Sequence, residues 1–527
     1  MTNEARDPRM TSEKCPAQSY FTLDANEARL TRLAEILAFK AQQGDIIALR
    51  GDLGAGKSTF ARAFIRAVLT DWQAEVPSPT FALRQDYGDC RLPIAHVDLY
   101  RLQSASDTDE LGLAEDACER VTLIEWPDRA PKLLGDDHVD IHLETTAHDD
   151  MRRVTITGHG ARAERVNRIE AIYRFLECSS FAADKRLTFL QGDASSRSYA
   201  RLHDNAGSIV LMDAPRQPDG PPVRDGKPYS RIAHLAEDLR PFAAIGDALV
   251  RHGMAATRIL ERDLVTGLLL VEDFGDQAFG ALVASGKPQR PMWLAAVDAL
   301  VELRRLPSAV PLPVGDGSLY SLPRFDRAAL EIETELILDW YWPAVKDDTP
   351  RAEVRDEFRA LWAREIDKML AEPPGWFLRD YHSPNLFWLP EREGVRRVGL
   401  IDFQDALAEP WAYDLVSLLQ DARVDVPREL EREGFSRYCD AASAREPDFD
   451  RVAFAETYAR FGLQRNTRLV GLWVRLLKRD GKPGYLKHMP RTWDYIARNL
   501  EHPALAEMLH FYYRHFPSFL RRKPIVA

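Results

Sequence analysis

The sequence predicts two domains of different classes, an α/β domain followed by a bilobal α+β domain. Three observations lead to this prediction. The chain has 527 residues, more than one hydrophobic core usually serves. A buried strand, a glycine-rich loop and a helix follow one another between residues 46 and 69. Much later, long helices surround Asp380, Asn385 and Asp402, which stand in a pattern used for phosphoryl transfer.

The composition is that of an ordinary globular protein, with 45% hydrophobic and 29% charged residues. A net charge of −11 argues against a protein that holds nucleic acid on its own. No run of about 18 apolar residues occurs, so no membrane span is expected. The first residues carry mixed charge without an apolar segment, and five scattered cysteines favour reduced thiols over disulfides or zinc. We therefore expect a cytoplasmic protein.

The first domain is organised around a glycine-rich loop. Helical apolar spacing over residues 25–39 precedes a compact buried strand at residues 46–49, and a helix is expected at residues 59–69. Between strand and helix lies the pattern G-x-x-x-x-G-K-S, with the candidate nucleotide-binding residues Gly51, Gly54, Gly56, Lys57, Ser58 and Thr59. The glycines let backbone N–H groups surround phosphates at the positive end of the helix. Lys57 would reach the β and γ phosphates, and the Ser58 hydroxyl would bind Mg²⁺.

Two acidic residues at strand ends could complete this site, which we interpret as that of a P-loop NTPase. Residues 92–97 are strand-like and end at Asp98, and a cleaner strand at residues 121–124 ends at Glu125. A carboxylate at the tip of a buried strand beside such a loop is well placed to bind Mg²⁺ or to orient water. For each residue, an ordinary solvated strand end is the alternative.

Five ordered motifs between about residues 20 and 155 resemble the TsaE (YjeE) family, small bacterial ATPases of tRNA threonylcarbamoyladenosine synthesis. The motifs are Gly51–Thr59, Pro77–Phe81, His96–Leu102, Glu110–Leu113 and Ile124–Pro127. The resemblance implies ATP hydrolysis that supports a TsaB–TsaD-type complex acting on tRNA. It implies Mg²⁺ held by Ser58 and Glu125, with Asp98 and the segment Ser78–Phe81 coupling the nucleotide state to partners. The family more usually has Thr at the position of Ser58.

The string Gly158-His159-Gly160 ends the first pattern, and a helix over about residues 162–176 opens a new one. We therefore place the domains at residues 1–160 and 161–527. A stand-alone nucleotide kinase or GTPase is the alternative for the first domain.

The second domain is expected to begin with a small β-rich lobe, with strands at residues 187–190, 198–202 and 208–211. The turn at residues 192–197 lies where kinases place the loop that covers the ATP phosphates, which makes Ser195 and Arg197 candidates for ATP binding. A plain hairpin is the alternative. The segment Leu268–Phe274 is similar to the strand and hinge that join kinase lobes, so Glu272 is a further candidate.

The second lobe is expected to be helical and to carry the phosphoryl-transfer residues. Long helices are predicted at residues 293–305, 327–341, 352–370 and 454–478. Asp380 and Asn385 stand in the D-x-x-x-x-N spacing of a kinase catalytic loop, and a short apolar run then ends at Asp402. In this chemistry the first Asp deprotonates the attacking hydroxyl, while the Asn and the second Asp hold Mg²⁺ against the ATP phosphates.

One part of a protein kinase is missing. The third strand of the small lobe should carry a Lys for the α and β phosphates, but residues 208–215 contain none. Arg197 or Arg216 could substitute, or metal ions could carry more of the charge. A dead kinase is the alternative, which the intact set of Asp380, Asn385 and Asp402 argues against.

The loop from Asp380 to Asn385 resembles that of aminoglycoside phosphotransferase-like kinases, and further motifs are similar to the AmgK family. AmgK proteins are anomeric kinases of N-acetylmuramate and N-acetylglucosamine in bacterial cell-wall recycling. The motifs are Gly192–Arg197, Val210–Pro215, Leu322–Arg327, Arg379–His382, Ile401–Ala406, Tyr413–Leu419 and Gln464–Asn466. The resemblance implies an amino-sugar substrate whose C1 hydroxyl loses its proton to Asp380, and it makes the missing Lys a family trait.

Several assignments in the second domain stay open. Another small-molecule kinase, for an aminoglycoside, choline or a different amino sugar, is an alternative, as is a non-catalytic scaffold for the ATPase. Gln404, Asp405 and Arg465 are candidates for the sugar pocket. The helix at residues 454–478 alternates basic and apolar residues, which predicts an amphipathic helix with a solvated basic face.

Overall fold

The computed structural model describes residues 18–102, 111–113, 117–190, 197–409 and 411–525. The contacts within the chain divide it into two compact units. The first unit comprises residues 1–215 and 260–271, and the second comprises residues 216–259 and 272–527. The functional boundary near residue 160 therefore lies inside the first unit and stays a prediction.

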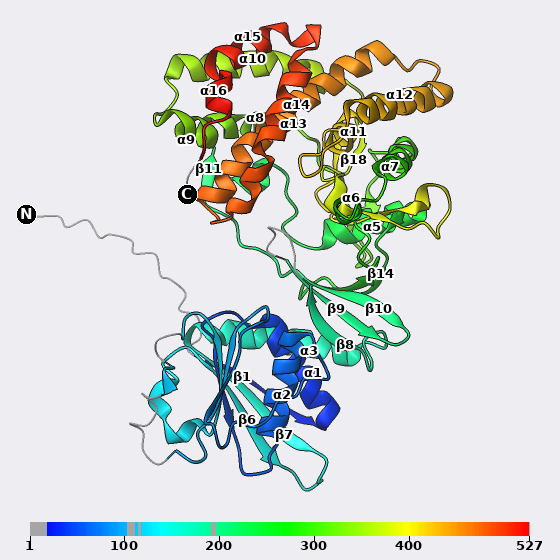
Figure 1. The fold of residues 1–527 in the computed structure, drawn as a ribbon. Helices are drawn as coiled ribbons and strands as arrows, with labels where there is room; N and C mark the ends of the chain where they lie inside the picture. The colour runs from blue at the N-terminus through cyan, green and yellow to red at the C-terminus, as the bar shows by residue number, and fades with distance from the viewer. Residues whose placement is uncertain (1–17, 103–110, 114–116, 191–196, 410, 526–527) are drawn as a thin grey trace, which may run out of the picture. The chain divides into compact units, whose positions relative to one another are not determined.

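The first unit contains a seven-stranded sheet with the strand order β1-β7-β6-β2-β5-β4-β3 (Figure 1). Its strands are β1 Gln18–Ala25, β2 Ile46–Arg50, β3 Arg84–Tyr87, β4 Ile94–Asp98, β5 Val121–Glu125, β6 Val139–Thr145 and β7 Arg152–His159. The central strands β6, β2, β5 and β4 run parallel, and the flanking pairs are antiparallel. Strands β4 and β5 are buried at every residue, as interior parallel strands are. The predicted α/β class is confirmed.

Among the described residues, the α-helices that accompany this sheet are α1 Glu27–Lys40, α2 Lys57–Leu69 and α3 Ala163–Cys178. Helix α1 begins after Asn26, whose side chain accepts a hydrogen bond from the Arg29 amide and so caps the helix. Helix α2 begins at the end of the glycine-rich loop. Gly51, which opens that loop, has a φ of +132°, and a Cβ at this position would lie 2.2 Å from the Leu143 carbonyl oxygen. Only glycine fits there.

The first unit also holds a five-stranded sheet with the order β14-β15-β10-β9-β8. Its strands are β8 Arg186–Leu190, β9 Ser198–Asp204, β10 Gly207–Asp213, β14 Ile259–Asp263 and β15 Leu268–Glu272, which confirms the strands predicted for the small lobe. Part of the apolar surface of this sheet lies in a core that it shares with the helices. Leu33 and Phe39 of α1, Ile172 of α3, and Leu187 and Leu211 of the five-stranded sheet belong to one buried cluster, which also reaches the seven-stranded sheet.

A buried ion cluster adds to this shared core. Asp213, at the end of β10, is fully buried. One of its oxygens lies 2.6 Å from Lys40 Nζ of α1, and the other accepts a hydrogen bond of 2.8 Å from Arg168 Nε of α3. The strand that lacks the expected Lys thus ends in a carboxylate that binds cations from both helices.

The second unit is largely helical. Its helices are α4 Tyr229–Ile232, α5 Arg240–Arg251, α6 Phe279–Ala284, α7 Gln289–Leu303, α8 Arg327–Leu336, α9 Trp342–Lys346, α10 Ala352–Leu370, α11 Ala412–Leu419, α12 Arg428–Arg445, α13 Arg451–Lys478, α14 Met489–Leu500, α15 Ala506–His515 and α16 Ser518–Arg521. The long helices predicted from periodicity are present, although a π-helical turn at Ile337–Tyr341 follows α8. Among the described residues, no helix combines the length and apolar character needed to cross a membrane.

Short strands in this unit position its loops. They are β11 Pro222–Arg224, β12 Lys227–Pro228, β13 Ala255–Ala256, β16 Leu312–Pro313, β17 Leu319–Tyr320, β18 Gly375–Phe377, β19 Leu386–Trp388, β20 Val398–Leu400 and β21 Leu407–Glu409. Strand β19 pairs with β20, and β18 pairs with β21. These pairings bring the ends of the two segments that carry Asp380 and Asp402 together.

The predicted solvated basic face of α13 is wrong at Arg465 and Arg468, near the middle of the helix. Arg465 is buried, and the Arg468 side chain is only 13% exposed. The reason is a buried carboxylate on a neighbouring helix: Glu333 of α8 lies 3.3 Å from Arg468 Nε. Lys478 and Arg479, at the other end of the helix, are exposed as predicted.

Replacing Asp213 with Asn tests the ion cluster of the first unit. The variant leaves Lys40 and Arg168 partly buried without their anionic partner, so we expect a loss of about 3 kcal/mol in the free energy of unfolding. Denaturant unfolding of the full chain measures it. Asp219→Asn is the control, because the Asp219 side chain is 43% exposed and its ion pair with Arg231 should matter little. Equal unfolding curves for the two variants would contradict a stabilising cluster.

Candidate active sites

The glycine-rich loop forms one side of a cavity of about 270 Å³ in the first unit. The cavity is lined by Leu53, Gly54, Gly56, Lys57, Ser58, Thr59, Ser78, Thr80, Asp98, Tyr100, Glu125 and Trp126. Lys57 Nζ donates hydrogen bonds to the carbonyl oxygens of Gly51 and Asp52, at 2.8 and 2.9 Å. Burial lowers the pKa of Lys57, against the opposing effects of Glu125, Asp98 and Asp52. All of the predicted loop residues except Gly51 therefore line one cavity.

The structure brings both predicted strand-end carboxylates to this cavity. Asp98 and Glu125 are register partners on the parallel strands β4 and β5. Ser58 Oγ donates a hydrogen bond of 2.9 Å to Glu125 Oε2. Thr80 Oγ1 donates a hydrogen bond of 2.7 Å to Asp98 Oδ2, which connects the segment Ser78–Phe81 to the Asp98 carboxylate. Asp98 and Glu125 are both buried, so neither is an ordinary solvated strand end.

Two residues of this site were not assigned a role from the sequence. His96 Nε2 lies 3.0 Å from Glu125 Oε1, and the indole ring of Trp126 lies 3.7 Å from Lys57 Nζ. His96 could have been found, because strand residues two apart share a face and His96 stands two residues before Asp98. The left-handed backbone of Trp126, at φ +60°, had no local sequence signal.

In the second unit, the Arg379–Asn385 loop and Asp402 converge. Asn385 Nδ2 donates to the Asp380 carbonyl oxygen at 3.0 Å and lies 3.4 Å from Asp402 Oδ2. Asp402 Oδ1 accepts a hydrogen bond of 2.9 Å from Gln404 Nε2. The Asp380 side chain is 27% exposed, so a hydroxyl group can reach it. The three predicted residues thus form a cluster of oxygen ligands with an accessible carboxylate beside it.

The backbone of this loop is strained and is held by a buried carboxylate. Arg379 and Asp402 have φ values of +70° and +57°, which non-glycine residues rarely adopt. Asp414 of α11 accepts hydrogen bonds from the amides of Leu378 and Arg379, at 2.5 and 3.0 Å. Burial and the nearby Asp380 raise the pKa of Asp414 to about 7, although the two amides oppose the shift. Asp414 therefore fixes the residues directly before Asp380.

The side chain of Arg379 is held by a second buried carboxylate, Glu333. The Arg379 guanidinium forms an ion pair with Glu333 and donates to the Ala233 carbonyl oxygen at 2.7 Å. Gln464 Nε2 donates to Glu333 at 3.0 Å. Burial alone would raise the pKa of Glu333, but Arg468, Arg379 and Gln464 together lower it below its ordinary value. No local pattern indicates this cluster, since its members lie far apart in the chain.

The other ATP-binding and sugar-pocket candidates of the second predicted domain lie in different surroundings. Ser195 lies outside the described residues, and Arg197 directly precedes β9. Glu272 forms ion pairs with Arg258 and Arg392, at 3.1 and 2.7 Å. Among the sugar-pocket candidates, Gln404 orients Asp402, and Asp405 accepts a hydrogen bond of 2.7 Å from the Ala236 amide. Arg465 is buried, and two of its guanidinium nitrogens have no hydrogen-bond partner among the described residues.

Comparison with known proteins gives each part a family. The model of "Threonylcarbamoyl adenosine biosynthesis protein TsaE" matches residues 24–154, and that of "Phosphotransferase enzyme family" matches residues 186–454. The N-acetylmuramate/N-acetylglucosamine kinase of Caulobacter vibrioides is 37% identical over 357 residues, which cover 66% of this chain and 96% of the relative. The chain belongs to the phosphotransferase enzyme family.

Its amino-terminal part belongs to the TsaE family. The TsaE protein of Rickettsia felis is 32% identical over 163 residues, which cover 31% of this chain and 94% of the relative. The solved structure of YdiB from Bacillus subtilis aligns with 30% of this chain and 99% of its own, at 27% identity and a TM-score of 0.26. The predicted fusion of the two families is confirmed, and the chain is an enzyme with ATPase and phosphotransferase activity.

Replacing Glu333 with Gln tests the support of the catalytic loop. The variant leaves the buried Arg379 and Arg468 without an anion, so we expect a loss of about 3–5 kcal/mol in the free energy of unfolding. Because the pKa of Glu333 is lowered in the folded state, its contribution is complete above about pH 4.3 and is lost as the pH falls through the folded pKa. Denaturant unfolding at several pH values measures both effects.

Glu331→Gln, on the same helix, is the matched control. The Glu331 side chain is 34% exposed, and its contacts with Arg224 and Arg327 are long, at 4.0 and 3.6 Å. We expect it to change stability by less than about 1 kcal/mol. If the Glu331 variant were as unstable as the Glu333 variant, the buried cluster would not contribute more to the free energy of unfolding than an exposed ion pair does.

Proposed function

We propose that the chain is bifunctional. Its amino-terminal part hydrolyses ATP in support of tRNA threonylcarbamoyladenosine modification, through a TsaB–TsaD-type complex that contacts tRNA. Its second part transfers phosphate from ATP to the anomeric hydroxyl of N-acetylmuramate or N-acetylglucosamine in cell-wall recycling. The observation that carries the proposal is that both sets of phosphoryl-transfer residues, Lys57–Ser58–Glu125 and Asp380–Asn385–Asp402, are assembled within regions that match nearly whole relatives.

The residues of the first site fit a nucleotide with Mg²⁺. Ser58 Oγ and Glu125 Oε2 are 2.9 Å apart, and such hard oxygen donors are those that Mg²⁺ prefers. Bound there, the ion would neutralise phosphate charge. Lys57 would exchange its two carbonyl partners for phosphate oxygens, and the amides of the loop would bind the phosphates at the start of α2. Asp98 would hold Thr80 and so connect the site to the surface that partners contact.

The second site supports deprotonation of a sugar hydroxyl. Asp380 would accept the proton as the hydroxyl attacks the γ phosphate of ATP, and Asp414 and Glu333 would keep the loop in its strained geometry. Asn385 and Asp402 offer oxygen ligands to Mg²⁺, which would neutralise phosphate charge when it is bound. Gln404 would fix the orientation of the Asp402 carboxylate.

Replacing Lys57 with Ala separates the first activity from the second. We expect ATP hydrolysis by the first site to fall about 100-fold or more, because a preorganised phosphate contact is lost. A strain that depends on the variant should then lose threonylcarbamoyladenosine, which mass spectrometry of tRNA nucleosides measures. Sugar phosphorylation should stay at the wild-type rate. Lys132→Ala, at an exposed lysine, is the control. Normal tRNA modification by the Lys57 variant would refute the proposed role.

Replacing Asp380 with Asn tests the second activity. We expect the rate of phosphate transfer to fall about 10²–10⁴-fold with the protein still folded, since a general base contributes that much. The assay offers Mg-ATP with N-acetylmuramate, N-acetylglucosamine, an aminoglycoside or choline and follows the labelled product, whose lability in mild acid marks phosphorylation at C1. Asp425→Asn is the control, at a side chain that is 86% exposed.

The substrate panel decides among the alternatives. Transfer to an aminoglycoside or choline alone would replace the amino-sugar assignment, and transfer to none of the compounds would favour a scaffold. An Asp380 variant that retains the wild-type rate would mean that another group accepts the proton.

A further inference from the structure

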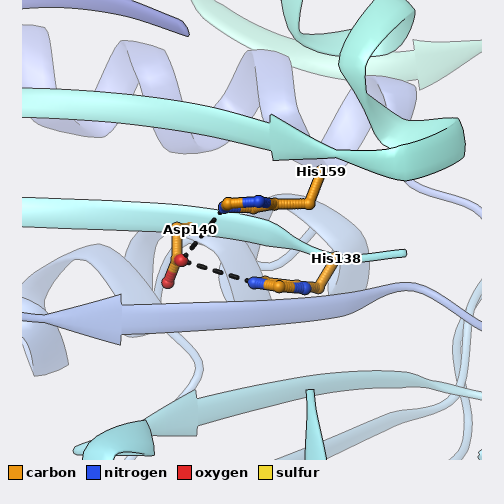
Figure 2. Close-up of side chains that lie close together, drawn as sticks. All are labelled: His138, Asp140 and His159. Carbon is orange, nitrogen blue, oxygen red and sulfur yellow. Dashed lines mark hydrogen bonds and ion pairs between the residues drawn. The ribbon is translucent and has the colours of Figure 1, made fainter. Parts of the chain in front are cut away.

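Three potential metal ligands meet at one end of the seven-stranded sheet, in a place that neither proposed activity uses. His138 directly precedes β6, Asp140 is the second residue of that strand, and His159 is the last residue of β7. Strand residues two apart point to the same face of a sheet. The His159 amide donates to the His138 carbonyl oxygen at 2.9 Å, so the two histidines are neighbours across the strands. Figure 2 shows the three side chains together on that face.

The two nitrogen–oxygen pairs are spaced as one ion would need them, and all three ligand atoms lie within 4.8 Å of one another. Asp140 Oδ2 lies 3.3 Å from His138 Nε2 and 3.3 Å from His159 Nε2. The two imidazole rings are stacked, with centroids 4.2 Å apart, and both direct Nε2 to the same carboxylate. In a tetrahedral zinc site with bonds of about 2.0–2.1 Å, two ligand atoms lie about 3.3 Å apart. The nitrogen–oxygen separations therefore already match a zinc site.

The surrounding contacts prepare these atoms for a metal. His138 Nδ1 lies 3.1 Å from the Gly135 carbonyl oxygen, which can only accept, so a neutral His138 with its proton on Nδ1 would present Nε2 to an ion in place of its 3.3 Å contact with Asp140 Oδ2. Arg50 Nε donates to Asp140 Oδ1 at 2.7 Å, which leaves Oδ2 for the ion. The side chains of His138, Asp140 and His159 are 11%, 17% and 29% exposed. An ion can thus enter from solvent, and a water molecule can take the fourth position.

We propose that His138, Asp140 and His159 bind a zinc ion. Two imidazole nitrogens and one carboxylate oxygen form a ligand set that zinc accepts readily, whereas Mg²⁺ prefers oxygen ligands alone. The site lies away from the phosphate loop, because β6 runs parallel to β2 and Val139 pairs with Ile47, at the start of β2. Arg50 connects the two, as it immediately precedes Gly51 and holds Asp140. The ion would fasten β6 to the end of β7, just before α3.

Zinc binding to the full chain tests the proposal. The chelator-stripped protein, without nucleotide, is titrated with zinc against a chromophoric chelator, and Co²⁺ is used separately to report tetrahedral coordination by its visible absorption. We expect one site in the wild type that His159→Ala weakens at least tenfold. His142→Ala is the matched control, since His142 is an exposed histidine of the same strand and lies outside the cluster. Any binding by the exposed Cys118 and Cys178 is common to all variants.

A second variant keeps the test decisive if His159→Ala does not fold. Asp140→Asn retains the shape of the side chain and should also weaken zinc binding and abolish the intense Co²⁺ absorption. Zinc should raise the melting temperature of the wild type and of the His142 variant, and not that of the other two. Equal zinc affinity in all four proteins, or no zinc bound by the wild type, would overturn the proposal and leave a hydrogen-bonded His–Asp–His cluster.

Discussion

The phosphotransferase site depends on one carboxylate that water does not reach. Glu333 is fully buried and is compensated by Arg379, Arg468 and Gln464, which belong to the catalytic loop and to α13. A buried charge is tolerated only when its partners are fixed, so this cluster restricts the loop and both helices to one arrangement. The strained φ of Arg379 is held in place by two buried carboxylates, because Glu333 pairs with its side chain and Asp414 accepts from its amide. The accessible Asp380 is thus carried on a rigid support.

The first unit depends on a different constraint, a hydrophobic core that belongs to two sheets at once. Helix α1 packs against α2, which begins at the phosphate loop, and also against β8 of the five-stranded sheet. Leu30 of α1 comes close to Gly56 of that loop, while Phe39 near the other end of α1 lies against Phe189. A single helix therefore contacts both the proposed ATPase site and the small lobe of the phosphotransferase. The two parts therefore bury some of their apolar surface against one another.

The sequence predicted what is encoded locally. The phosphate loop and the Asp380–Asn385 spacing lie within short segments, and short apolar runs precede Gly51 and Asp402, so the fold class and both sets of candidate residues could be proposed from the sequence. The buried cluster around Glu333 could not, because its charges become neighbours only after helices pack. The His138–Asp140–His159 cluster required the register of β6 against β7, which no local pattern specifies. The solvated face expected on α13 failed for the same reason, since Glu333 attracts Arg468 into the interior.

The end of the strand that lacks the lysine is tied into the shared core. Residues of β10 alternate between two faces, and Ile209, Leu211 and Asp213 occupy the face that joins the common core. Met212, on the other face, is apolar and buried. Asp213, the charged residue at the end of this strand, is negative and forms ion pairs with Lys40 and Arg168. A lysine in place of Asp213 would oppose two cations in a buried setting, which is costly. Strand β10 thus helps to hold the five-stranded sheet against α1 and α3. The phosphate charge has to be neutralised by groups other than a lysine of this strand.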